Sequence, residues 1–133
     1  VYQQVAGADG VPEYASAKAR AIVERHREAV AIARDAGVRI GAGSDAGSPG
    51  TPHPALLKEI ECLVGAGLPP TEALAAATSI AAEALGLEGE IGRVCAGLAA
   101  DLILVEGDPT ASVAALRHVT HVWQQGRLTV PPM

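Results

Sequence analysis

The chain has 133 residues, of which 49% are hydrophobic, and a formal net charge of −5 at pH 7. This length is enough for one ordinary domain with a hydrophobic core. The mild acidity and the scattered positions of the Lys and Arg residues argue against a nucleic-acid partner. No uncharged apolar run approaches the roughly 20 residues that a membrane-spanning helix needs, so we expect no membrane partner either.

The first four residues, VYQQ, have neither the basic nor the apolar region of a signal peptide, and the first residue is not Met. We therefore expect a cytoplasmic chain that is a piece of something longer. Cys62 and Cys95 form no Cys-x-x-Cys motif, so neither a zinc clip nor a redox pair is indicated. Two free thiols in a reducing cytoplasm are the expectation.

A long helix is predicted over residues 13–36, because apolar residues recur there at helical spacing. Gly37 is expected to end it. The short apolar run 38–42 then predicts a strand buried on both faces, as in a parallel sheet. A Gly-rich loop follows over residues 43–52.

Three further helices are expected. One begins near Pro54 and ends at Gly65. The run PPTE at residues 69–72 is typical of a helix start, with Thr71 as the expected N-cap. Two short Ala-rich helices follow, divided near Thr78 and stopped by Gly86.

From residue 89 the pattern changes from helical to strand-like. Strands are predicted over residues 90–94, 101–105 and 118–124, with turns between them. The chain therefore reads as a βα part over residues 1–88 and a small β part over residues 89–133.

The run GAGSDAG at residues 41–47 is the most informative segment. It places the carboxylate of Asp45 directly after a buried strand, at the edge where ligands gather in parallel α/β folds. On local pattern alone the favoured interpretation is different: Asp45 makes a turn or caps the next helix. A nucleotide-binding βα domain is a weaker alternative, because the glycine spacing is one residue too long for the dinucleotide motif.

Four histidines are candidates for binding roles. His53 precedes a helix and could meet a substrate carboxylate or a metal-bound group, although a capping or solvent-facing role is equally open. His26 lies in an apolar helical stripe and is expected to be structural. His118 and His121 are three apart in a predicted strand, so they point to opposite faces and cannot easily chelate one ion.

These segments together resemble the C-terminal portion of the amidohydrolase superfamily. Residues 37–47 (GVRIGAGSDAG) are similar to its last barrel strand, and residues 122–127 to its final hairpin. Between them lie segments similar to the family's C-terminal signature: EIECLVGAG (59–67), EALAAAT (72–78), AAEALGL (81–87) and GRVCAGLAADLILVEGDP (92–109). Within the superfamily the chain is most similar to the imidazolonepropionase-like and prolidase-like group.

The resemblance implies an α/β fold: a C-terminal fragment of a (β/α)8 TIM-like barrel over residues 1–88, then the C-terminal half of a small β-sandwich over residues 89–133. It also implies that Asp45 binds a divalent metal, usually zinc, and moves a proton from the attacking water to the leaving nitrogen. A carboxylate beside a metal suits that role. His53 matches a histidine that is often found beyond this loop in the prolidase-like group. The resemblance therefore implies that His53 contacts the substrate.

Most of the family's metal ligands have no counterpart in this sequence. The His-x-His pair, the bridging lysine or glutamate and two later histidines are missing, and one carboxylate cannot hold a catalytic zinc, which needs about three protein ligands. We expect a metal-dependent hydrolase of amide, cyclic amide or dipeptide C–N bonds that is inactive and lacks zinc as an isolated chain. The alternative is a non-catalytic truncated or split-gene module that completes a partner chain. We also expect self-association, or association with the missing N-terminal part.

Overall fold

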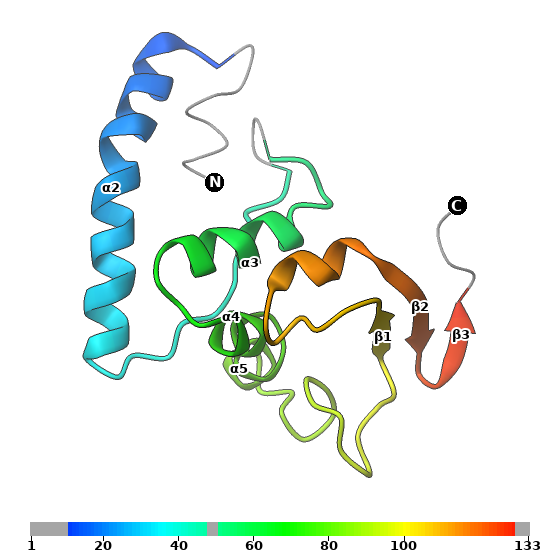
Figure 1. The fold of residues 1–133 in the computed structure, drawn as a ribbon. Helices are drawn as coiled ribbons and strands as arrows, with labels where there is room; N and C mark the ends of the chain where they lie inside the picture. The colour runs from blue at the N-terminus through cyan, green and yellow to red at the C-terminus, as the bar shows by residue number, and fades with distance from the viewer. Residues whose placement is uncertain (1–10, 48–50, 130–133) are drawn as a thin grey trace.

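The computed structural model describes residues 11–47 and 51–129. A long helix stands at one side, three shorter helices pack in the middle, and a small sheet lies at the other side (Figure 1). The elements in chain order are α2 (Glu13–Asp35), α3 (Leu56–Gly65), α4 (Pro70–Ala77), α5 (Ser79–Ala84), β1 (Leu102–Val105), the 3-10 helix η1 (Val113–Arg117), β2 (Val119–Gln124) and β3 (Arg127–Thr129).

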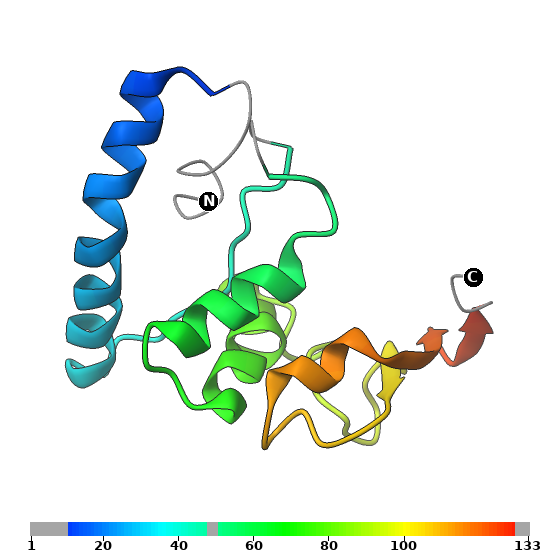
Figure 2. The same cartoon turned by 45° about the horizontal axis from the view of Figure 1, so that its top comes forward.

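Helix α2 confirms the first predicted helix to within a residue. It ends at Asp35, and Gly37 follows with φ +74°, a conformation that glycine adopts without steric cost. Both views show α2 set apart from the other helices along most of its length (Figures 1 and 2). Near its C-terminal end, an ion pair of 2.9 Å joins Arg34 Nε to Glu72 Oε2 of α4.

The middle helices agree with the prediction in number and breaks but not in capping. Thr71 is not an N-cap: α4 begins at Pro70, and Pro69 occupies the N-cap position without a side-chain cap. The fixed φ of proline suits the first position of a helix, so Pro70 starts the helix two residues earlier than a cap at Thr71 would. The predicted division at Thr78 is confirmed, and Gly86, with φ +70°, follows α5.

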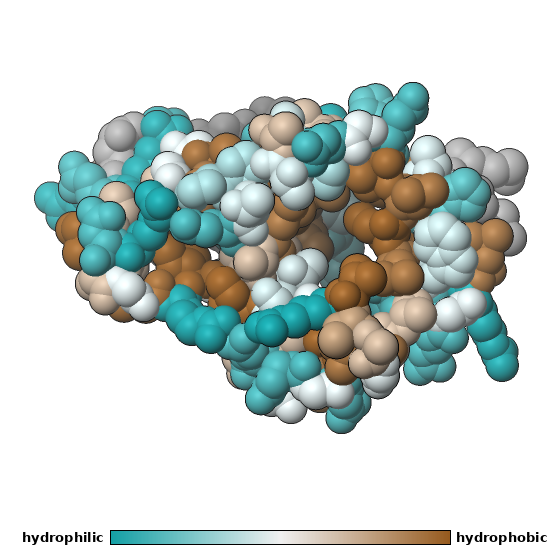
Figure 3. All heavy atoms as spheres, turned by 60° about the horizontal axis from the view of Figure 1, so that its bottom comes forward, coloured by the Kyte–Doolittle hydropathy of each residue, from teal (hydrophilic) through white to brown (hydrophobic). Residues whose placement is uncertain are grey.

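The hydrophobic core is small and lies among α3, α4 and η1. Its buried members are Ile60, Leu63, Leu68, Ala73, Ala76 and Val113. Large apolar side chains are exposed outside it, and Figure 3 shows them as patches on one face of the molecule. The most exposed are Val94 at 89%, Tyr14 at 78% and Leu85 at 72%.

The predicted strand at 38–42 is not a strand in this structure. The segment is extended but pairs with no other strand among the described residues. A parallel strand needs neighbouring strands, and residues 11–47 and 51–129 place none beside this segment. The segment is instead attached to the helices: the N–H of Ala42 donates to the carbonyl of Ala76 (2.9 Å), and Ile40 packs against the core.

The C-terminal residues form a three-stranded antiparallel sheet in the order β1-β2-β3. Leu102, Trp123 and Leu128 are paired across it and share one face. Strands β1 and β2 confirm two of the predictions, whereas the predicted strand at 90–94 is wrong. Gly92 has φ +93°, and a Cβ on it would lie 2.7 Å from the Cβ of Ala82, so this segment packs as a tight turn on α5.

The described fold is thus mixed helix and strand, with the helical part before the sheet. A second sheet that would complete a sandwich is not among residues 11–47 and 51–129, so the half-sandwich stays a prediction. In the same residues, no helix is both long and apolar enough to cross a membrane.

Candidate active-site loop

Asp45 lies at the end of the extended segment, in the left-handed region with φ +50°. Few residues other than glycine adopt this conformation, and Asp and Asn are among those that tolerate it. The carboxylate-bearing side chain is exposed. The position therefore combines a sharp change of chain direction with an accessible acid, which fits both a turn residue and a ligand.

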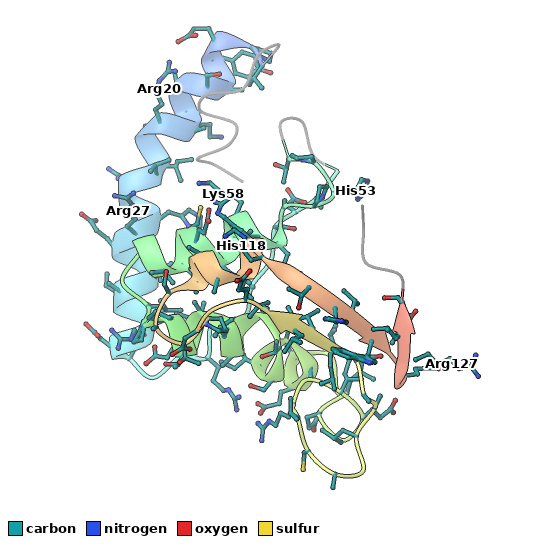
Figure 4. The ribbon with its side chains drawn as sticks, turned by 45° about the vertical axis from the view of Figure 1, so that its right-hand side comes forward. Arg20, Arg27, His53, Lys58, His118 and Arg127 are labelled. Atoms are coloured by element: carbon teal, nitrogen blue, oxygen red, sulfur yellow. The ribbon has the colours of Figure 1, made fainter. Side chains whose placement is uncertain are left out.

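The loop after Asp45 turns back on itself and brings His53 close. The N–H of Gly47 donates to the carbonyl of Thr51 (2.9 Å), which closes the turn. The ring of His53 then lies against Gly47, because a Cβ on that glycine would be 3.8 Å from the ring atom Cε1. Figure 4 shows His53 on this loop, away from Arg127 of the sheet. Asp45 and His53 thus belong to one compact loop.

Thr51 is a member of this loop that the sequence did not single out. Its side chain is 2% exposed, and its hydroxyl has no hydrogen-bond partner among the residues the structure describes. A buried unsatisfied hydroxyl costs about 1–3 kcal/mol. No sequence signal marks it, since a threonine close to several prolines is typical of any loop. Thr51 is therefore a buried polar side chain in a loop whose acid, Asp45, is exposed.

The other histidines lie elsewhere. His26 lies on α2 with an exposed side chain, so it is less enclosed than an apolar stripe predicts. His118 follows η1, and His121 lies in β2 with its ring stacked on Trp123, the ring centroids 5.5 Å apart. None of these three residues lies against Gly47 as the His53 ring does.

A hollow of about 300 Å³ opens between α2, α3 and the extended segment. Val30, Ile40 and Leu63 line it together with His26 and Cys62, whereas Asp45 and His53 do not. Burial raises the pKa of the Cys62 thiol, as expected beside apolar side chains. Because neither Asp45 nor His53 lines this hollow, it is not the candidate active site.

The donor set of the described residues does not fit a catalytic metal by itself. No three His, Cys, Asp or Glu side chains within residues 11–47 and 51–129 are grouped so that they could hold an ion. Asp45 is one carboxylate, and catalytic zinc sites use about three protein ligands. A metal centre that includes Asp45 would therefore need ligands from outside these residues.

Comparison with known proteins identifies relatives over almost the whole chain. The family model described as "Amidohydrolase family" matches residues 4–129. Ochratoxinase of Aspergillus niger is 31% identical over 128 residues, which are 93% of this chain and 26% of that protein. Imidazolonepropionase of Rubrobacter xylanophilus is 44% identical over 68 residues, which are 49% of this chain and 16% of that protein.

A solved structure agrees with these matches. The crystal structure of a Xaa-Pro dipeptidase with bound methionine in the active site superposes with a TM-score of 0.82 and 30% identity, covering 96% of this chain and 31% of that one. The chain therefore spans between about a sixth and a third of the length of these relatives.

Proposed function

The chain belongs to the amidohydrolase family, and from that premise we propose that it is the C-terminal part of a metal-dependent hydrolase. The proposed substrates are small molecules with an amide, cyclic amide or dipeptide C–N bond. The relatives support this range, since they include an ochratoxinase, an imidazolonepropionase and a Xaa-Pro dipeptidase. The proposal is for the whole protein; the isolated chain is expected to be inactive.

The observation that carries the proposal is the compact loop that holds Asp45 and His53. An exposed carboxylate in a left-handed turn and an imidazole packed on Gly47 lie a few residues apart. The hydroxyl of Thr51 in the same loop is buried and has no hydrogen-bond partner within residues 11–47 and 51–129.

Each loop residue has a proposed role. The side chain of Asp45 would be one ligand of a divalent metal, proposed to be zinc, which would lower the pKa of water for attack on the substrate carbon. Asp45 would accept the proton that the attacking water loses and deliver it to the leaving nitrogen. His53 would contact the substrate, for instance by donating a hydrogen bond to the carboxylate of a dipeptide.

The test compares the chain alone with the whole protein that contains it. Both are assayed against Xaa-Pro dipeptides, N-acyl amino acids and small cyclic amides, with added zinc and with a chelator. We expect turnover by the whole protein only, lost with the chelator and regained with metal. If the whole protein, loaded with metal, hydrolysed none of these bonds, the proposed function would be wrong.

The second candidate function is a non-catalytic module that completes a partner chain. Two observations favour it: the chain covers 26% of the length of ochratoxinase, and the described residues hold no three-ligand cluster. Activity that appears when the chain is mixed with a separate polypeptide carrying the missing ligands would support this alternative. Activity found only when both parts belong to one polypeptide would support the first.

We also propose that the protein acts in the cytoplasm and that this chain associates with other polypeptide. Cys62 and Cys95 are both free thiols, which suits a cytoplasmic protein. The exposed apolar side chains suit association with the remainder of the protein or with a second copy of the chain.

A further inference from the structure

The break between α4 and α5 has an unusual hydrogen-bond pattern centred on Thr78. Its backbone leaves the helical region, with φ −129° and ψ −92°. Its N–H donates to the carbonyl of Ala75, three residues back (3.1 Å), and its hydroxyl donates to the carbonyl of Leu74 (2.7 Å). In an uninterrupted helix the N–H of residue 78 would take the Leu74 carbonyl, so the hydroxyl stands in for it.

The break also redirects the next carbonyl of the helix. In a continuous helix the carbonyl of Ala76 would accept the N–H of Ile80. Here it accepts the N–H of Ala42 at 2.9 Å, from the extended segment that leads to Asp45. Ala76 is fully buried, so this hydrogen bond lies in the interior of the molecule. It joins α4 to the backbone only three residues before Asp45.

Three further contacts show that the break is a junction between the two helices, the extended segment and the turn at Gly92. Gly92 packs on its other side, and a Cβ there would lie 3.0 Å from the carbonyl oxygen of Thr78. On α5, the carboxylate of Glu83 forms ion pairs with Arg39 of the extended segment and with Arg93, beside Gly92. The two sides of the junction are thus joined through α5 as well.

We propose that Thr78 is a positioning residue for the active-site loop: its hydroxyl maintains the helix break, and the break holds the Ala76 carbonyl for the N–H of Ala42. The functional part of this inference rests on the role proposed for Asp45. The structural part does not, because it concerns only which N–H the Ala76 carbonyl accepts.

The test is hydrogen exchange in the whole protein, with three variants of Thr78. Thr78→Ala removes the hydroxyl and introduces the strongest helix former, which favours one continuous helix in which Ile80 competes for the Ala76 carbonyl. Thr78→Val removes the hydroxyl but is a poorer helix former, and Thr78→Ser keeps the hydroxyl. Peptides covering residues 38–43 report the Ala42 N–H, and peptides covering 60–63 of the α3 core serve as the internal reference.

Exchange at residues 38–43 should rise by about tenfold in Thr78→Ala relative to the reference, the order expected for one interior hydrogen bond. The rise should be smaller in Thr78→Val and absent in Thr78→Ser. The kcat should fall in the same order with KM little changed. An unchanged rate at 38–43 in Thr78→Ala, or an equal rise at 60–63, would overturn the proposal.

Two further results remain decisive. If Thr78→Ala does not fold, the comparison of Thr78→Val with the wild-type protein decides in the same way, because valine has the size and shape of threonine without the hydroxyl. Thr78→Ser then shows the effect of losing only the methyl group. If the whole protein has no hydrolase activity, the proposed function fails, but the exchange rates still decide whether Thr78 positions the segment.

Discussion

Asp45 is the residue at which a structural and a catalytic role can be separated most cleanly. Asn tolerates the left-handed conformation at φ +50° as well as Asp does, so Asp45→Asn should keep the turn. It cannot accept a proton from water, and it is a poorer metal ligand. In the whole protein, kcat should fall by at least about 10²–10⁴-fold, with little change in the thermal midpoint.

Asp35→Asn is the matched control for this substitution. Asp35 is also exposed but lies at the C-terminal end of α2, and its replacement should leave kcat near the wild-type value. If Asp45 were only a turn residue, Asp45→Asn would leave both turnover and stability near the wild-type values, because Asn serves in such turns and caps as well as Asp does. That pattern would remove the catalytic assignment.

Asp108 provides a pH-dependent prediction at the same scale. Its carboxylate accepts hydrogen bonds from the hydroxyl (2.6 Å) and the N–H (2.8 Å) of Thr110, and these lower the pKa of Asp108 below its usual value of 3.8. A lowered folded-state pKa contributes stability above the usual pKa, and this is lost as the pH falls through the folded-state value. The contribution of Asp108 is therefore present at neutral pH and disappears below about pH 4.

Thr110→Val removes the hydroxyl, the larger cause of the shift, and should raise the pKa of Asp108 toward 3.8. Thr110→Ser keeps a donor and should leave it low. An NMR titration of the Asp108 carboxyl in both variants measures this. Equal pKa values in the two variants would show that the Thr110 hydroxyl is not the cause.

Among the elements, α5 is joined to two separate segments through one side chain. Glu83 is partly buried, with 25% of its side chain exposed, and pairs with both Arg39 and Arg93. Exposed ion pairs contribute about 0.2–1 kcal/mol each, so Glu83→Gln should lower the free energy of unfolding by about 1 kcal/mol. The loss should shrink at high salt, because the pairs are partly solvent-exposed.

Denaturant unfolding at low and high salt measures this effect. Glu88→Gln is the control, since Glu88 is exposed and follows the same helix. An equal loss in both variants, or a loss independent of salt, would show that the pairing of Glu83 does not stabilise the junction.

The elements also show which parts of a fold a sequence encodes locally. The helix Glu13–Asp35 was predictable because its periodicity and its terminating glycine are local signals. The strand at 38–42 was not, because strand formation depends on neighbouring strands, and the described residues place none beside this segment. The strand at 90–94 failed because Gly92 packs against α5, a contact between residues ten apart that no local pattern reports.

Part of the candidate site could likewise be predicted from the sequence, and part could not. The sequence placed Asp45 in the loop 43–52 and His53 directly after that loop, and in the structure the His53 ring lies against Gly47, two residues after Asp45. It did not reveal the buried hydroxyl of Thr51 or the redirected carbonyl of Ala76, because both depend on tertiary contacts. The roles of the two loop residues stay predictions until the variants are measured.

At the scale of the whole molecule, the core is too small to cover the apolar side chains. Its largest members are Leu and Ile, while Ile103, Leu104 and Leu128 of the sheet are 50% to 58% exposed. Exposed patches beyond a few hundred Å² drive association. The isolated chain should therefore form dimers or larger species in sedimentation velocity, whereas a cooperatively unfolding monomer would contradict this expectation.

Metal content tests the central claim, that the chain supplies one ligand of a metal centre whose other ligands lie outside it. The measurement is elemental analysis of the isolated chain and of the whole protein, both purified without chelators. We predict no stoichiometric zinc in the isolated chain, at least one tightly bound divalent metal in the whole protein, and a reduced content in its Asp45→Asn variant. About one tightly bound metal per isolated chain, or an undiminished content in that variant, would contradict the account.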